Sequence, residues 1–190
     1  MDRPATLLVL LLAGLLAGCG GGSRPTGIRA AETPADDVAA YQPLGRPHTV
    51  DPTQYRKVFL AGTIDMGRSS DWQAALVARF RDSIGGRWLF FNPRRREFHA
   101  SPAEMEYQVA WELAHLEAAD LIVMNLLGDS RSPISLLEMG LYARSGKLFV
   151  ACSPDYYRYD NVRITCRRYG VPLYDSLTAL LDDLPQQSDE

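Results

Sequence analysis

The 190-residue sequence is poor in the residues that metal and redox sites require. It has 3 cysteines and 3 histidines, and no two cysteines stand at zinc-binding spacing. We therefore expect neither a metal nor a cofactor. The glycine-containing loop at 62–67 matches neither the dinucleotide-binding pattern nor the P-loop, and the chain has no Gly-x-Ser-x-Gly nucleophile elbow. No motif supports binding of NAD or ATP, or a serine hydrolase.

An excess of basic charge is also absent. The chain has 20 Lys and Arg against 23 Asp and Glu, a net charge of −3, and a pI near 5.6. Nucleic-acid-binding proteins are normally basic, so no nucleic acid polymer is expected as a partner. With 46% hydrophobic and 23% charged residues, the composition is that of a globular protein with a real core. Collagen, a coiled coil and a wholly disordered chain are excluded.

The amino terminus has the features of a secretory signal. Residues 1–18 carry Arg3 and then an apolar run that is shorter than the roughly 20 residues of a membrane span. The run ends in Leu-Ala-Gly-Cys at 16–19, which resembles the lipobox of bacterial lipoproteins. The resemblance implies cleavage before Cys19 and its lipidation, for example with palmitate. The protein would then be lipid-anchored to a membrane of the bacterial cell envelope, facing away from the cytoplasm. A plain signal peptide or a helical anchor is the alternative.

Residues 19–54 are rich in Gly and Pro and show no hydrophobic periodicity. Such a segment buries too little apolar area to offset its chain entropy. We therefore predict a flexible, lipidated tether, followed by one domain over 55–190. Outside the cytoplasm disulfides are permitted, and Cys152 and Cys166 remain as a pair. The sequence leaves open whether they are bridged.

From Lys57 onward, short β-rich runs alternate with longer helical ones, a pattern typical of βαβ units around a parallel sheet. The predicted strands cover 57–62, 87–92, 120–127, 147–153 and 171–175. The predicted helices cover 71–83, 101–119, 132–146, part of 156–169, and 177–184. We expect an α/β domain with a doubly wound, five-stranded parallel sheet, flavodoxin-like in its three-layer arrangement.

Two glutamates fall on the helices that should flank the third predicted strand. Glu138 lies within the apolar stripe Ile134, Leu137 and Leu141, where a charge is costly unless it is paired or functional. An edge position or a buried ion pair would also account for it. Glu112 stands on the preceding helix at the same height, roughly 12 Å above the bottom of the sheet. Two carboxylates that converge on a cleft suit chemistry at a glycosidic bond.

Four segments together resemble the nucleoside 2-deoxyribosyltransferase-like proteins. They are KVFLAGTID at 57–65, the Asn-Pro-Arg turn at 92–94, QVAWELAHLEAADLIVMNL at 108–126 and SPISLLEMGLYARSGK at 132–147. The resemblance implies that Glu138 attacks C1′ of a deoxyribose, expels the base and holds a covalent glycosyl intermediate until water or a second base takes the sugar. It also implies a small-molecule nucleoside or nucleotide as partner, and oligomers in which subunits complete each other's sites.

The resemblance assigns roles residue by residue. Glu112 stands where the well-known transferases have an Asp, and Ser132 stands where they have an acidic residue six positions before the nucleophile. This departure leaves the proton donor to the departing base open, with nearby Asp129 as a substitute. The expected catalytic residues are Glu138, Glu112 and Asp129. The expected substrate-binding residues are Gly62, Thr63, Asp65, Asn92, Arg94, Gln108, Trp111 and Ser132.

Two groups of residues have two interpretations each. Arg94, Arg95 and Arg96 either form a solvated loop or recognise an anionic group such as a 5′-phosphate, for which guanidinium groups are suited. The second interpretation favours hydrolysis of nucleoside monophosphates over base exchange. Met66 and Phe91, with Trp111, either form a flat surface for a nucleobase or belong to the core.

The predicted function is therefore a membrane-tethered transferase or hydrolase that acts on an N-glycosidic bond. The Ser at 132 and an envelope location keep open an alternative, an inactive lipoprotein that senses a nucleotide-like ligand. A structural lipoprotein with an inert cleft is a third, weaker interpretation.

Overall fold

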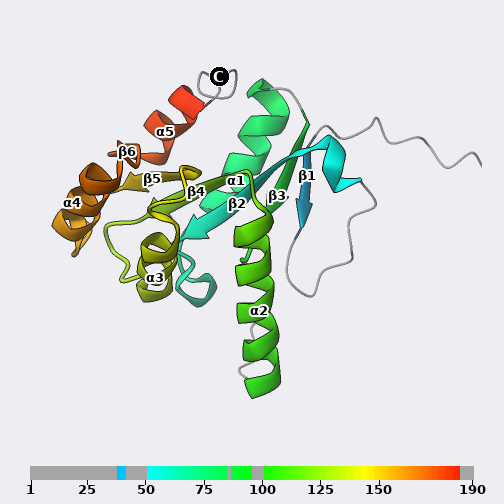
Figure 1. Cartoon of the computed structure of the whole chain (residues 1–190), viewed down its shortest axis with the longest axis horizontal. Helices are drawn as coiled ribbons and strands as arrows, with labels where there is room; N and C mark the ends of the chain where they lie inside the picture. Colours follow the sequence, from blue (N-terminus) through cyan, green and yellow to red (C-terminus); the bar gives the residue numbers. More distant parts are fainter. Residues whose placement is uncertain (1–37, 42–50, 85–86, 96–100, 185–190) are drawn as a thin grey trace, which may run out of the picture. The chain divides into compact units, whose positions relative to one another are not determined.

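A computed structural model describes residues 38–41, 51–84, 87–95 and 101–184 of the chain. Within these residues the sheet has six strands, all parallel, in the order β1-β3-β2-β4-β5-β6 (Figure 1). The strands are β1 Val38–Tyr41, β2 Arg56–Gly62, β3 Trp88–Phe91, β4 Leu121–Leu126, β5 Leu148–Cys152 and β6 Leu173–Tyr174. The helices are α1 Trp72–Arg79, α2 Pro102–Ala118, α3 Pro133–Tyr142, α4 Tyr159–Tyr169 and α5 Leu177–Asp183.

Side-chain caps fix the starts of the first two α-helices. The side chain of Asp71 accepts a hydrogen bond from the backbone N–H of Ala74 and so caps α1. Ser101 accepts from the N–H of Glu104 at the start of α2, with Pro102 in the first turn. These caps fix where the two helices leave the loops that follow β2 and β3.

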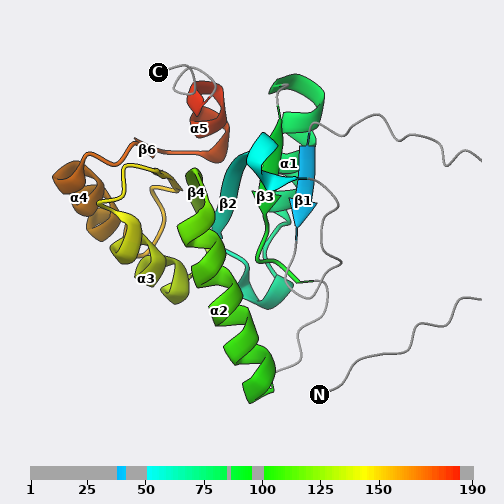
Figure 2. The same ribbon diagram turned by 45° about the vertical axis from the view of Figure 1, so that its right-hand side comes forward.

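Alternate residues of the central strands face two apolar layers. Along β4, Ile122, Met124 and Leu126 pack in the layer that also holds side chains of α2, α3 and α4. Leu121 and Val123 pack in the other layer, with side chains of α1 and α5. The sheet is therefore covered by helices on both faces, which explains why its strands read as continuous hydrophobic runs (Figure 2).

The predicted doubly wound parallel sheet is confirmed, because the five predicted strands form in the flavodoxin order. The chain reverses direction across the sheet between β2 and β4, which makes their carboxyl ends the place where a ligand is expected. β1 is an addition: it pairs in parallel with the outer edge of β3. The prediction of a flexible tether over 19–54 is therefore wrong for Val38–Tyr41, whose four residues are too few to show a period in the sequence.

The predicted signal peptide and Cys19 lie outside the described residues. Among the residues that the structure does describe, no helix is both long and apolar enough to cross a membrane. Cys152 and Cys166 are free thiols, both buried in the apolar layer under α4, so the disulfide that the sequence left open is not formed. Burial raises the pKa of Cys152 to about 12 and that of Cys166 to about 11.

The predicted inward face of α3 is wrong. Ile134, Leu137 and Leu141 are exposed, while Ser135 and Glu138 are buried. On α2 the apolar residues Met105, Val109 and Leu113, which also have helical spacing, are likewise exposed, although Leu116 is buried. The inner faces of these two helices carry polar residues because they border a cavity as well as the core.

Candidate functional site

A cavity of about 430 Å³ opens at the carboxyl ends of the central strands, where the sheet order reverses. This volume lies within the range typical of small-molecule sites. Its walls come from the end of β2 and the loop after it, the turn after β3, and one side each of α2 and α3. The lining residues are Ala61, Gly62, Ile64, Asp65, Met66, Gly67, Pro93, Arg95, Met105, Gln108, Val109, Glu112, Ser132, Pro133, Ile134, Ser135 and Glu138.

The floor of the cavity depends on a close approach of two strands. Gly62 ends β2 with a φ of +123°, and a Cβ added there would lie 2.2 Å from the carbonyl oxygen of Asn125 on β4. No residue with a side chain fits that position. The next residue, Thr63, donates its N–H to the same carbonyl at 2.9 Å. Its hydroxyl accepts from the N–H of Leu127 at 3.1 Å and so joins the loops after β2 and β4.

A network of hydroxyl groups joins these loops to the start of α3. The Ser132 hydroxyl lies 2.8 Å from that of Thr63 and 2.7 Å from that of Ser130. Ser130 donates to Asp65 Oδ1 at 3.0 Å. Ser132 adopts the left-handed conformation and makes no side-chain cap bond to α3. Of the predicted binding residues, Asp65 and Ser132 therefore line the cavity, whereas Thr63 is fully buried and supports them from outside its wall.

Helix α2 contributes Gln108 and Glu112, one turn apart and joined by a hydrogen bond. Gln108 Nε2 donates to Glu112 Oε1 and also to the carbonyl of Pro93 at 3.3 Å. Arg95 donates from Nε to Gln108 Oε1 at 2.6 Å. Gln108, itself bound by Arg95, thus provides the Glu112 carboxylate with a hydrogen-bond donor.

Glu138 faces the same cavity from α3, and its surroundings are different. The residue is only 8% exposed, and no described residue donates a hydrogen bond to its carboxylate or forms an ion pair with it. Burial, and then the negative charge of Glu112, raise the pKa of Glu138 to about 8. The pKa of Glu112 is also raised by burial, against which Gln108 and Arg95 act. The two predicted catalytic glutamates therefore form one electrostatically coupled pair.

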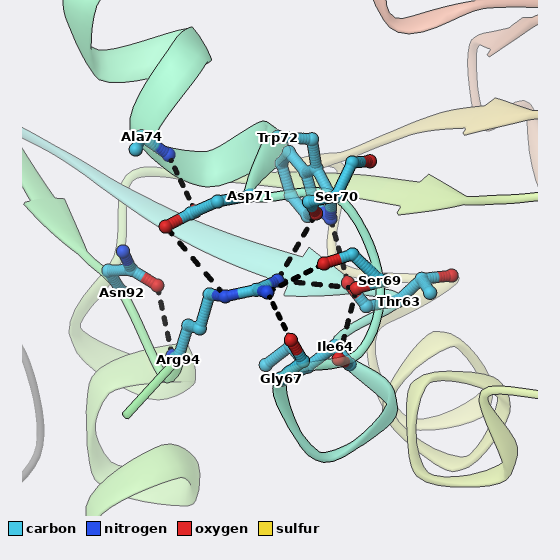
Figure 3. Close-up of polar contacts among 10 residues, drawn as sticks. All are labelled: Thr63, Ile64, Gly67, Ser69, Ser70, Asp71, Trp72, Ala74, Asn92 and Arg94. Carbon is cyan, nitrogen blue, oxygen red and sulfur yellow. Dashed lines mark hydrogen bonds and ion pairs between the residues drawn. The ribbon is translucent and has the colours of Figure 1, made fainter. Parts of the chain in front are cut away.

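Arg94 does not line the cavity, which corrects its predicted role in substrate binding. Its guanidinium group turns back into the loop that follows β2 (Figure 3). It donates to the carbonyls of Gly67, Ser69 and Ser70 at 3.0, 2.7 and 3.2 Å, and lies 3.8 Å from the Asp71 carboxylate. With only donors, a guanidinium group can join several carbonyls at once. Arg94 fixes the shape of this loop.

Asn92 has a related structural role. It lies outside the cavity wall, and its side-chain oxygen accepts from the N–H of Arg94 at 3.0 Å, as Figure 3 also shows. The loop that Arg94 holds includes Asp65 and Met66, both with positive φ. These strained residues form one side of the cavity, so Asn92 and Arg94 shape the site from outside its wall, while Pro93 between them lines it.

Two further predicted site residues, Asp129 and Trp111, do not line the cavity. Asp129 is exposed and does not line the cavity, because the turn after β4 carries Ser130 inward in its place. Trp111 is buried in the core, where its ring stacks on His115 with centroids 4.0 Å apart. Phe91 belongs to the same core, while Met66 is exposed at the cavity wall.

Among the polar lining residues, sequence reasoning missed Ser135 and did not separate Arg95 from its neighbours. Ser135 is buried one turn before Glu138, and no hydrogen bond links its hydroxyl to another described residue. Arg95 was one of three equivalent arginines in the sequence, and only its neighbours in the fold distinguish it from Arg94. Among the described residues, no group of three His, Cys, Asp or Glu side chains is arranged to hold a metal ion.

The family assignment agrees with this geometry. Residues 55–156, more than half of the chain, match the sequence model of a family described as nucleoside 2-deoxyribosyltransferase like. The chain belongs to this family. Every residue that lines the cavity of this nucleoside 2-deoxyribosyltransferase-like protein lies within the matched segment. Membership supports a function in glycosyl transfer with a small nucleoside-type partner. No curated protein matches the chain.

Proposed function

We propose that the protein cleaves the N-glycosidic bond of a nucleoside or nucleotide through a covalent glycosyl intermediate on Glu138. The observation that carries this proposal is the state of the Glu138 carboxylate, which is buried, lacks a partner among the described residues and faces a cavity. Burying such a group without a partner costs free energy. A buried carboxylate that faces a cavity without a protein partner is explained best by binding to a ligand or reacting with it.

The chemistry uses one proton shared by Glu138 and Glu112. In this proposal the proton begins on Glu138, whose pKa is raised to about 8 by burial and then by the charge of Glu112. As the Glu138 oxygen attacks C1′, its proton passes to the Glu112 carboxylate. The bond from C1′ to the base nitrogen breaks, the electron pair goes to the base, and Glu112 delivers the proton to it. The sugar remains as an ester of Glu138.

The second half of the reaction releases the sugar. Water or a second base attacks C1′, the ester bond breaks, and the proton of the attacking group returns through Glu112 to the pair. Two displacements at one carbon give retention of configuration. This scheme assigns the proton transfer to Glu112, because Asp129 lies outside the cavity.

The cavity wall offers groups for both parts of a nucleoside. The apolar side chains of Ile64, Met66 and Val109 provide a surface for the base. The hydroxyl groups of Ser132 and Ser135 and the Asp65 carboxylate provide hydrogen-bond partners for sugar hydroxyls or for a 5′-phosphate. Such a mixed wall fits a compact polar ligand with one flat apolar face.

One observation favours the alternative of a ligand-binding sensor. Ser132 carries no acidic group at the start of α3, and Asp129 does not replace it in the cavity. The deciding experiment incubates the full chain with deoxynucleosides, their 5′-monophosphates and NAD, and measures base release by chromatography. The proposal predicts release that Glu138→Gln abolishes and that Glu106→Gln, on the exposed side of α2, leaves unchanged. A ligand-dependent rise in melting temperature without base release would contradict the enzyme and support the sensor.

We also propose that the protein self-associates through α2 and α3. Six large apolar side chains on these helices are between 41% and 61% exposed: Met105, Val109, Leu113, Ile134, Leu137 and Leu141. Three of them also belong to the cavity wall, so a second copy seated there would close the cavity. Sedimentation at several concentrations should show an oligomer for the wild-type chain and a monomer for Leu137→Glu. A wild-type monomer at micromolar concentration would contradict self-association.

A lipid anchor at Cys19 and a position at the cell envelope are further proposals that rest on the sequence at 1–19. Expression in a bacterial host with an alkyne-labelled fatty acid should label the wild-type chain and not Cys19→Ala. Cys152→Ala is the matched control and should keep the label. An unlabelled wild-type chain in the soluble fraction would contradict the anchor.

A further inference from the structure

We propose that Arg95 is a positioning residue that acts through Gln108 on Glu112 and so decides which of the two cavity glutamates holds their shared proton. The use of that proton in base release rests on the proposed function. The arrangement of Arg95, Gln108, Glu112 and Glu138 does not depend on that function, and it can be tested separately.

Arg95 is held in a nearly closed environment. Its side chain is 6% exposed, and Nη1 lies 3.3 Å from Glu104 Oε2. Its Nε donates to Gln108 Oε1 at 2.6 Å. Glu104 thus anchors the guanidinium group from the first turn of α2, while the opposite side of the group contacts Gln108.

The chemistry of arginine then fixes the orientation of Gln108. A guanidinium group has donors and no acceptor, so Gln108 must turn its oxygen towards Arg95. Its amino group therefore points the other way, where it donates to Glu112 Oε1 and to the carbonyl of Pro93. A flipped Gln108 amide would place its amino group against the donors of Arg95 and its oxygen against the carboxylate of Glu112. Only one orientation of the amide is therefore stable.

The donor that Gln108 presents favours the ionised form of Glu112, because a carboxylate accepts and cannot donate. No described residue gives Glu138 comparable support. The other charged groups that line the cavity are Asp65, which accepts from Ser130, and Arg95 itself. Burial, and then the negative charges of Glu117 and Glu138, raise the pKa of the Tyr142 hydroxyl, one turn further along α3.

The pKa directions agree with this asymmetry. Gln108 and the charge of Arg95 lower the pKa of Glu112 against the effect of burial, whereas burial and Glu112 both raise that of Glu138. Replacing Arg95 by Met removes a positive neighbour of Glu112 and frees the Gln108 amide to rotate. The proton should then move towards Glu112, and Glu138 should ionise more readily.

The experiment follows the carboxyl carbons of Glu112 and Glu138 by NMR during a pH titration of the full chain labelled with ¹³C-glutamate. Glu112→Gln and Glu138→Gln assign the two signals. In the wild-type chain we expect the titration near pH 8 at Glu138. In Arg95→Met the midpoint of Glu138 should fall by at least about 1 pH unit, a roughly tenfold change in its acid dissociation constant, while that of Glu112 rises.

Two variants separate orientation from charge. Gln108→Leu should shift both midpoints in the same directions as Arg95→Met, and the double variant should add little, because Arg95 acts through Gln108. Arg131→Met is the control, since it removes an exposed positive charge outside the cavity wall. If Arg95→Met does not fold, the shift in Gln108→Leu is the deciding result.

Unchanged midpoints in both Arg95→Met and Gln108→Leu would overturn the inference, as would equal shifts in Arg131→Met. Failure of the proposed function has a different signature. If the midpoints move as expected and no substrate is cleaved, the role of Arg95 stands and the enzymatic proposal falls. If base release is measured and the midpoints do not move, the reverse holds.

Discussion

Glu138 on α3 and Glu112 on α2 face one cavity from two helices, and the negative charge of Glu112 helps to raise the pKa of Glu138 to about 8. Two carboxylates in this arrangement titrate as a pair, and in the proposed mechanism the form with one proton both attacks C1′ and protonates the base.

The first prediction concerns the pH dependence of base release. The value of kcat/KM should pass through a maximum, because the pair carries two protons at low pH and none well above pH 8. Glu112→Gln should abolish the alkaline decrease together with most of the activity, about 100-fold or more. An activity that keeps rising from pH 8 to pH 10 would contradict proton delivery by the pair.

The second prediction concerns stability. Glu138 has a higher pKa when folded than when unfolded, so the unfolded chain releases this proton first as the pH rises. The contribution of Glu138 to the free energy of unfolding is therefore fully present below about pH 4.5. It declines above that pH and is lost as the pH passes 8. The wild-type chain should lose up to about 4–5 kcal/mol of its free energy of unfolding in this way at alkaline pH, and Glu138→Gln should not. Urea unfolding at pH 5 and pH 9 measures the effect, and parallel curves for variant and wild type would contradict it.

The third prediction concerns Gly62. Alanine at this position would place its Cβ against the backbone of Asn125, and its φ is unfavourable as well. We expect Gly62→Ala to lower the free energy of unfolding by about 3 kcal/mol or more. Gly140→Ala, on α3 with open space around the new Cβ, is the control and should stabilise by about 0.5–1 kcal/mol. Similar unfolding midpoints for the two variants would show that the approach of β2 to β4 is not tight.

The fourth prediction concerns the loop held by Arg94. Arg94→Met should loosen the backbone at Gly67–Ser70 and with it the cavity wall at Asp65 and Met66. We expect KM to rise about tenfold with a smaller change in kcat, since the glutamate pair is not touched. Arg81→Met, which changes an exposed arginine, should leave both constants unchanged. A fall in kcat at constant KM would mean that Arg94 serves the chemical step.

The sequence predicted the elements of the fold because local patterns specify them. The alternation of short β-rich runs with longer helical ones predicts β2 to β6 and the helices that connect them. The same patterns misled on the helix faces, since Ile134, Leu137 and Leu141 have helical spacing yet are exposed. A periodic stripe shows which residues share a face, and it cannot show whether that face meets the sheet or a partner.

At the site, the positions of Glu112 and Glu138 could be predicted because helix rise fixes their height above the sheet. The different roles of Arg94 and Arg95 could not, because adjacent residues of one turn point in different directions that only the folded loop determines. The exposed position of Asp129 could not be predicted either, because its neighbour Ser130 is the residue that is buried. Such differences depend on backbone conformations that the residue types alone do not specify.

The most direct test of the account is to trap the glycosyl intermediate. The full chain is mixed with a deoxynucleoside or its 5′-monophosphate, quenched in acid within milliseconds, digested and examined by mass spectrometry. The account predicts that the peptide containing Glu138 gains the mass of one deoxyribosyl unit, with its phosphate where the substrate has one, and that Glu138→Gln gains nothing. Base release by the wild-type chain with no adduct at Glu138, or with an adduct on another residue, would contradict it.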